Sequence, residues 1–177
     1  MTGMNENTIP NLLVENARKV FSVMLGMEIE PQPVLSETYL EGPEGGVVSL
    51  IGLVGAWIGS GSLCCASDVA CKISGRLLMA EYDSVNEDVL DAVGELTNMI
   101  IGNFKDEAEP YLGTLALNTP TVVYGRNFRA RSLAGTRWTT VPLQTEYGMV
   151  SVKVCMAPAQ GTATDSRTTS NLVVAGR

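Results

Sequence analysis

The sequence predicts an α+β domain in which long helices pack on a mainly antiparallel sheet. Before Pro110, three segments repeat their apolar residues with the helical period of 3.6, whereas after Pro110 apolar and polar residues alternate as in strands. Helices grouped against one sheet in this way are typical of antiparallel architectures. With 177 residues, the chain is long enough to bury one core of ordinary size.

The first helix is predicted to begin near Pro10, because proline is favoured in the first turn of a helix. Residues 1–9 are polar and lack periodicity, which predicts a loose leader. The apolar residues that follow at helical spacing are Leu12, Leu13, Ala17, Val20, Phe21, Met24 and Leu25. Gly26 ends the pattern, as glycine often ends a helix. We therefore expect an amphipathic helix packed on the rest of the domain.

Strands follow the first helix. Residues 34–40 are predicted to form a short strand, and residues 47–58 and 60–65 favour longer ones. Gly59 and Gly61 are expected to supply the bend between the two longer strands. This part of the sequence therefore predicts a hairpin.

Two more helices are predicted after the hairpin. One runs from Ser67, a suitable N-cap, to about Leu77. The other is longer, covers residues 87–108 and follows a turn-forming stretch. Its core-facing stripe consists of Val89, Val93, Leu96, Ile100 and Phe104.

The last third of the sequence favours strands at residues 113–124, 136–144 and 148–157. Residues 158–177 are mostly small and polar and cannot bury enough surface to fold, so we expect a disordered tail. The predicted domain is therefore residues 10–157.

Composition excludes several classes of function. Twelve Lys and Arg against 19 Asp and Glu give a net charge of −7, the wrong sign for a nucleic-acid-binding protein. The first ten residues lack the features of a targeting peptide, and the longest apolar run is too short to cross a membrane, so we expect a cytoplasmic protein without membrane insertion.

The cysteine and histidine content limits the chemistry further. The four cysteines form no CxxC pair and the chain has no histidine, so we expect no metal site of its own and thiols that are buried in the core. Without an imidazole base, the common serine and cysteine hydrolase mechanisms are excluded. Any catalysis must use carboxylates, amides, lysines or a site on another protein.

The outer face of the third helix carries the most informative residues. Asp91, Glu95 and Asn98 are spaced i, i+4 and i+7, which places them in one narrow exposed strip. Gly94 flanks the strip and Gly102 continues it. Glycine in a helix costs about 1 kcal/mol relative to alanine. These glycines therefore either let a partner protein approach or admit a neighbouring element of the same domain.

Residues 91–105, with the sequence DAVGELTNMIIGNFK, resemble the signature helix of the CheC/CheX/FliY phosphatases. That signature has Asp or Ser, Glu and Asn at the positions of Asp91, Glu95 and Asn98, and a proline at the position of Pro120. CheC has two such helices and CheX has one. The first predicted helix of this chain has Asn11, Glu15 and Arg18 at the spacing of the signature. Arg18 stands where the signature has the asparagine amide. The resemblance is therefore to the CheX type, with a CheC-like fold.

The resemblance implies a phosphatase for the aspartyl phosphate of a CheY-type response regulator in chemotaxis or related two-component signalling. It implies that Asn98 positions the attacking water and that Glu95 anchors the lysine beside the partner's phosphoaspartate. Asp91, Gly94 and Gly102 would contact the partner. The chain would need no cofactor of its own, because the magnesium ion belongs to the partner regulator. Family members of this type also tend to form homodimers.

Three alternatives remain open from the sequence. The chain can be a non-catalytic module or scaffold that binds phosphorylated regulator. The glycine-rich segments at residues 42–61 would suit a small-molecule binding domain, although residues 55–61 lack the strand, loop and helix context of a phosphate-binding loop. A basic cluster, most simply a solvated loop and otherwise an anion site, consists of Arg126, Arg129, Arg131 and Arg137.

Overall fold

A computed structural model of the chain describes residues 5–132 and 135–160. The elements are α1 (Thr8–Val20), η1 (Phe21–Leu25), β1 (Glu30–Pro31), β2 (Leu35–Glu37), β3 (Tyr39–Glu41), β4 (Gly46–Gly55), β5 (Trp57–Ala66), α2 (Ser67–Leu78), α3 (Glu87–Leu112), β6 (Leu115–Leu117), β7 (Thr121–Gly125), β8 (Arg129–Arg131), β9 (Trp138–Thr145) and β10 (Gly148–Pro158). The tail predicted at residues 158–177 lies outside the described residues from position 161 onward.

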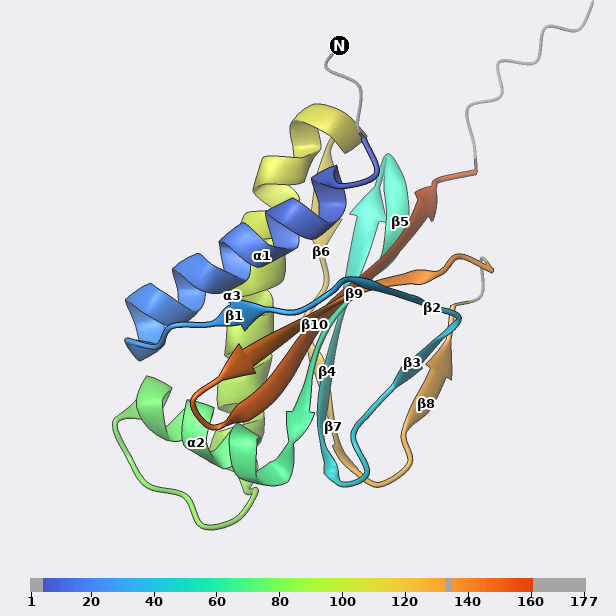
Figure 1. The fold of residues 1–177 in the computed structure, drawn as a ribbon. Coiled ribbons are helices and arrows are strands. Elements are labelled where there is room, and N and C mark those ends of the chain that lie inside the picture. Colours follow the sequence, from blue (N-terminus) through green and yellow to red (C-terminus); the bar gives the residue numbers. More distant parts are fainter. Residues whose placement is uncertain (1–4, 133–134, 161–177) are drawn as a thin grey trace, which may run out of the picture.

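The centre of the domain is an eight-stranded sheet with the order β1-β9-β10-β5-β4-β6, in which β2 also pairs with β9 and β7 with β4. The strand pairs that the structure describes are antiparallel. The three α-helices pack on one face of this sheet, and α1 lies alongside α3 (Figure 1). The predicted α+β class with a mainly antiparallel sheet is confirmed.

The first helix differs from the prediction at both ends. It begins at Thr8, two residues before Pro10, and after Val20 it continues as one π-helical turn, η1. A π turn has more residues per turn than an α-helix, so the residues after it are rotated relative to the α-helical pattern. As a result Leu25 is buried, whereas Met24, which was expected in the core stripe, is exposed.

The hairpin of β4 and β5 is confirmed, but its turn was placed wrongly. The chain reverses at Ala56, and Gly59 and Gly61 lie inside β5. Gly61 has a packing role, because a Cβ atom there would lie 2.7 Å from Ile101 Cγ1 of α3. The glycine therefore lets α3 lie close to the sheet.

Three further boundaries differ from the prediction. The strand expected at residues 113–124 is divided into β6 and β7, because the chain leaves the sheet around Pro120. Proline cannot donate a hydrogen bond to a neighbouring strand, which explains the break. The N-cap of α2 is Ala66 instead of Ser67, and α3 runs to Leu112, with Pro110 in its last turn.

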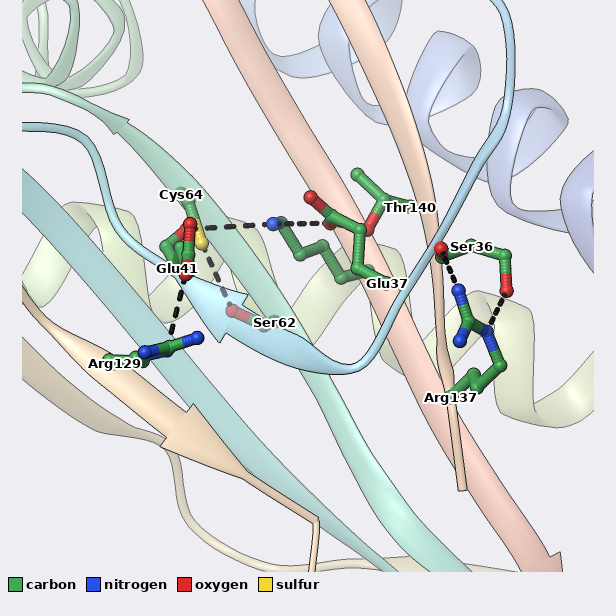
Figure 2. A network of polar contacts seen from close by, with 9 residues as sticks. Ser36, Glu37, Glu41, Ser62, Cys64, Arg129, Arg137 and Thr140 are labelled. Atoms are coloured by element: carbon green, nitrogen blue, oxygen red, sulfur yellow. Dashed lines mark hydrogen bonds and ion pairs between the residues drawn. The ribbon is translucent and has the colours of Figure 1, made fainter. Parts of the chain in front are cut away.

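The other face of the sheet is covered in part by the two-stranded sheet of β3 and β8, which the sequence analysis did not separate from the surrounding loops. A second, smaller apolar cluster fills the space beneath it; its buried members are Leu40, Val48, Cys64, Trp138 and Cys155. Arg129 Nε lies 3.2 Å from Glu41 Oε1 and joins the two strands, as Figure 2 shows.

Candidate functional site

The structure places the signature residues on a well-anchored helix. α3 begins at Asn86, whose side-chain Oδ1 accepts a hydrogen bond of 3.0 Å from the backbone N–H of Val89. Glu87 and Asp88 in the first turn complement the helix dipole. The predicted core stripe is confirmed, since its five residues are each at most 1% exposed; they are Val89, Val93, Leu96, Ile100 and Phe104.

Opposite this stripe, Asp91, Glu95 and Asn98 are exposed, as their spacing predicts. Among the described residues, the side chains of Glu95 and Asn98 form no hydrogen bond or ion pair. They are three positions apart on the helix, which corresponds to a rise of about 4.5 Å. A carboxylate and an amide therefore project from one rigid element, with their hydrogen-bonding capacity available to another molecule.

The two glycines face the segment that contains β6 and β7. Gly94 is buried, and a Cβ atom there would lie 3.2 Å from Val122 Cγ2 and 4.0 Å from Pro120 Cβ. At Gly102, the nearest atom would be Leu117 Cδ1 at 3.7 Å. These contacts favour the interpretation in which the glycines admit a neighbouring element. Partner binding by Gly94 and Gly102 stays a prediction.

Pro120, the last element of the motif, is brought beside the helix although it lies more than twenty residues after Asn98 in the sequence. Its position next to Gly94 places the β6–β7 connection along one side of the strip. On α1, the residues at the corresponding spacing, Asn11, Glu15 and Arg18, are also exposed.

The glycine-rich segment and the basic cluster both contain residues with structural roles. The glycine-rich residues 55–61 form the β4–β5 turn and the start of β5, and the chain continues as strand to Ala66. Arg129 lies 3.7 Å from the centre of the Tyr39 ring, and Arg137 Nε donates a 2.7 Å hydrogen bond to Ser36 Oγ. Arg129 thus links β8 to β3, and Arg137, just before β9, is held to β2.

The sequence analysis missed an ion pair between the buried Lys153 and the half-buried Glu37, on the sheet face opposite the helices. Lys153 Nζ lies 2.9 Å from Glu37 Oε2, and Thr140 donates a hydrogen bond to the same oxygen. Figure 2 shows Glu37 beside Thr140. Burial raises the pKa of the Glu37 carboxyl, but the hydrogen bond from Thr140 and the Lys153 ammonium outweigh burial and lower the pKa below its ordinary value. The one feature of the sequence that could have indicated this ion pair is a lysine, Lys153, inside the apolar strand VSVKVCM.

The four cysteines are buried and free. Burial raises the pKa of the Cys64, Cys65 and Cys71 thiols, so these side chains are neutral at physiological pH. Within residues 5–132 and 135–160, no three cysteine, aspartate or glutamate side chains come together as metal ligands would. Over the same residues, no helix has both the length and the apolar character needed to cross a membrane.

Comparison with known proteins gives a consistent result. The family model described as "Chemotaxis phosphatase CheX" matches residues 47–144. A curated relative, the CheY-P phosphatase CheX of Thermotoga maritima, is 29% identical over 125 residues, which cover 70% of this chain and 80% of the relative.

Solved structures share the fold over nearly their whole length. A CheC-like superfamily protein from Shewanella sp. PV-4 is 28% identical, with a TM-score of 0.74 over 87% of this chain and 99% of that one. The CheX of Borrelia burgdorferi, solved in a complex with CheY, BeF3 and Mg²⁺, is 23% identical, with a TM-score of 0.71 over 84% of this chain and 97% of that one. The fold is therefore CheC-like.

The family model covers more than half of the chain and includes the whole helix that carries Asp91, Glu95 and Asn98. The resemblance seen in the sequence is confirmed, and the chain belongs to the CheX family of chemotaxis phosphatases, within the CheC/CheX/FliY group.

Proposed function

We propose that this chain hydrolyses the aspartyl phosphate of a CheY-type response regulator by inserting the exposed strip of α3 into the regulator's phosphorylation site. The observation that carries the proposal is the pair of exposed side chains, Glu95 and Asn98, one turn apart on a rigid helix and engaged with no other described residue. The name of the Thermotoga relative and the Borrelia complex with CheY support the choice of substrate.

The chemistry suits a chain without histidine. An acyl phosphate already has a good leaving group, so catalysis consists mainly of placing a water molecule in line with the phosphorus and tolerating the developing charge. The Asn98 carboxamide can hold that water by donating or accepting a hydrogen bond. A carboxylate at the same position would repel the phosphoryl oxygens, so the amide is the better group.

Glu95 is proposed to pair with the lysine next to the partner's phosphoaspartate. Such a pair contributes mainly orientation and specificity, because desolvation offsets much of the attraction between the charges. Asp91, one turn earlier, would contact the partner at the edge of the same surface. The magnesium ion would be held by the regulator, in the cytoplasm where such regulators act.

The assay follows phosphate release from a panel of CheY-type regulators phosphorylated with a small-molecule phosphodonor. Wild-type chain should accelerate dephosphorylation of at least one regulator. Asn98→Ala should lose this acceleration, by about 100-fold or more, while its affinity for the regulator and its fold are kept. Activity of Asn98→Ala at the wild-type level would refute the role of Asn98.

Glu95→Ala should instead weaken binding of the phosphorylated regulator. Unchanged affinity would count against the anchoring role of Glu95. The competing function, a non-catalytic module that only sequesters phosphorylated regulator, is tested with chain present well below the regulator concentration, since only an enzyme releases phosphate from the excess.

We further propose that the chain forms a homodimer. The short strands β6 and β7 form one edge of the sheet and could pair with a second copy. Sedimentation measurements over a range of concentrations would decide between monomer and dimer.

A further inference from the structure

A groove runs between α1 and α3 beside the exposed strip. Lys19, Val20, Val23 and Met24 line it from α1 and η1, and Met99 and Asn103 line it from α3. Its volume is about 180 Å³. Met99 lies four residues after Glu95, which places it one turn along the same side of α3, so the groove adjoins the strip.

The π turn η1 gives this groove its apolar wall. In a continuous α-helix, Met24 would lie four residues after the buried Val20 and face the core. With the wider π turn, Leu25 takes the core position at 4% exposure, while Val23 is 73% and Met24 44% exposed.

The size and chemistry of the groove favour one kind of occupant. Sites for drug-sized molecules have volumes of about 300–1,000 Å³, so this groove fits a single side chain better than a small ligand. The strip itself offers only polar groups, whereas stable interfaces bury about 800 Å² on each partner around an apolar anchor. The groove supplies such an anchor site immediately beside the strip.

We propose that the groove of Val23, Met24 and Met99 binds an apolar side chain of the phosphorylated receiver domain while the strip of α3 enters its phosphorylation site. Lys19 at the rim favours an acidic residue next to that side chain. The inference rests on the proposed function, because it assigns the same partner to both surfaces.

The test uses the regulator that the wild-type chain dephosphorylates fastest in the panel above. Val23→Glu places a charge in the groove at a position exposed enough to leave the fold intact. It should raise KM about tenfold and leave kcat unchanged, which is the reverse of the effect of Asn98→Ala. Titration of the same regulator, activated with beryllium fluoride and Mg²⁺, should show the same loss in Kd.

Val54→Glu is the matched control. Val54 is 49% exposed on β4, on the sheet face opposite the helices, and the substitution should leave KM, kcat and Kd at wild-type values. Lys19→Glu gives a second measurement of the groove and should also raise KM. Thermal unfolding of each variant shows whether the fold is kept.

Three other outcomes would contradict either the groove as a docking site or the proposed function. A wild-type KM for both Val23→Glu and Lys19→Glu, with Asn98→Ala inactive, would overturn the groove as a docking site and leave the proposed function standing. A lower sedimentation mass of Val23→Glu than of wild type would place a second copy in the groove and also overturn it. Absence of wild-type activity on every regulator would instead refute the proposed function.

Discussion

α1 and α3 are two amphipathic helices on the same face of the sheet, yet only α3 carries the full set of signature residues. They run antiparallel and are joined by a 3.0 Å hydrogen bond from Asn16 Nδ2 of α1 to Glu107 Oε2 of α3. Both expose three residues at i, i+4 and i+7. α3 ends its triplet with the amide of Asn98, whereas α1 has the guanidinium of Arg18 there.

The two helices also differ in how firmly they are held. The N-cap side chain of α3 is hydrogen-bonded, and α3 contacts β4, β5, β6 and β7. The N-cap of α1, Asn7, forms no such side-chain bond, and α1 ends in a π turn that exposes apolar side chains. Under our two proposals, α3 supplies the catalytic groups and the end of α1 supplies the docking surface.

The largest expected effect on stability concerns the buried side of α3. Phe104→Ala should lower the free energy of unfolding by about 3–5 kcal/mol, because it leaves a cavity where a fully buried ring stood. Asn98→Ala should change it by less than about 0.5 kcal/mol, as surface substitutions usually do. Chemical denaturation of both variants would measure the contrast. Equal losses would contradict the assignment of one side to the core and the other to function.

The close approach of α3 to the sheet predicts a smaller loss. Gly61→Ala should lower the free energy of unfolding by about 1–3 kcal/mol, since its Cβ would overlap the buried Ile101 side chain. Gly125→Ala is the matched control, because no atom lies within 4 Å of a Cβ built there. If denaturation curves of the two variants coincide, Gly61 does not set the distance of α3 from the sheet.

The sheet face away from both helices should respond to pH. Glu37→Gln should lower the free energy of unfolding at pH 7 by about 1–3 kcal/mol, because it leaves the Lys153 ammonium buried without a counter-charge. The pKa of Glu37 is lowered from 4.5, so its stabilisation is complete above about pH 4.5 and is lost as pH falls through the folded-state value. Urea unfolding from pH 7 to pH 3 should show the difference between wild type and variant shrinking. A difference that grows at low pH would contradict the sign of the shift.

The smallest effect is expected from a substitution on α1, and it concerns phosphatase activity. Arg18→Asn puts an amide after Asn11 and Glu15, which brings the α1 triplet close to the signature. We nevertheless expect no added phosphatase activity, because the substitution supplies neither the Asp91 equivalent nor the flanking Pro120. The measurement is phosphate release by the double variant Asn98→Ala, Arg18→Asn. Recovery of activity would show that the amide alone separates the two helices.

Local patterns were sufficient for much of the fold and for the candidate strip. The core stripe of α3 and the exposure of Asp91, Glu95 and Asn98 follow from the helical period, because a long helix on a core must bury one side. The β9–β10 hairpin was also located closely, at residues 136–157. The catalytic roles of Glu95 and Asn98 came from the family resemblance, since a polar strip on a helix is by itself common.

The sequence alone pointed to the family and the helical strip. The lack of histidine also limited any catalysis to carboxylates, amides, lysines or a site on another protein. Tertiary structure decided the turn at Ala56, the exposure of Met24 at the end of α1, and the pairing of Lys153 with Glu37. These features depend on contacts between residues far apart in the chain. The energies of such contacts exceed local conformational preferences of a few tenths of a kcal/mol, and the contacts leave no periodic pattern in the sequence.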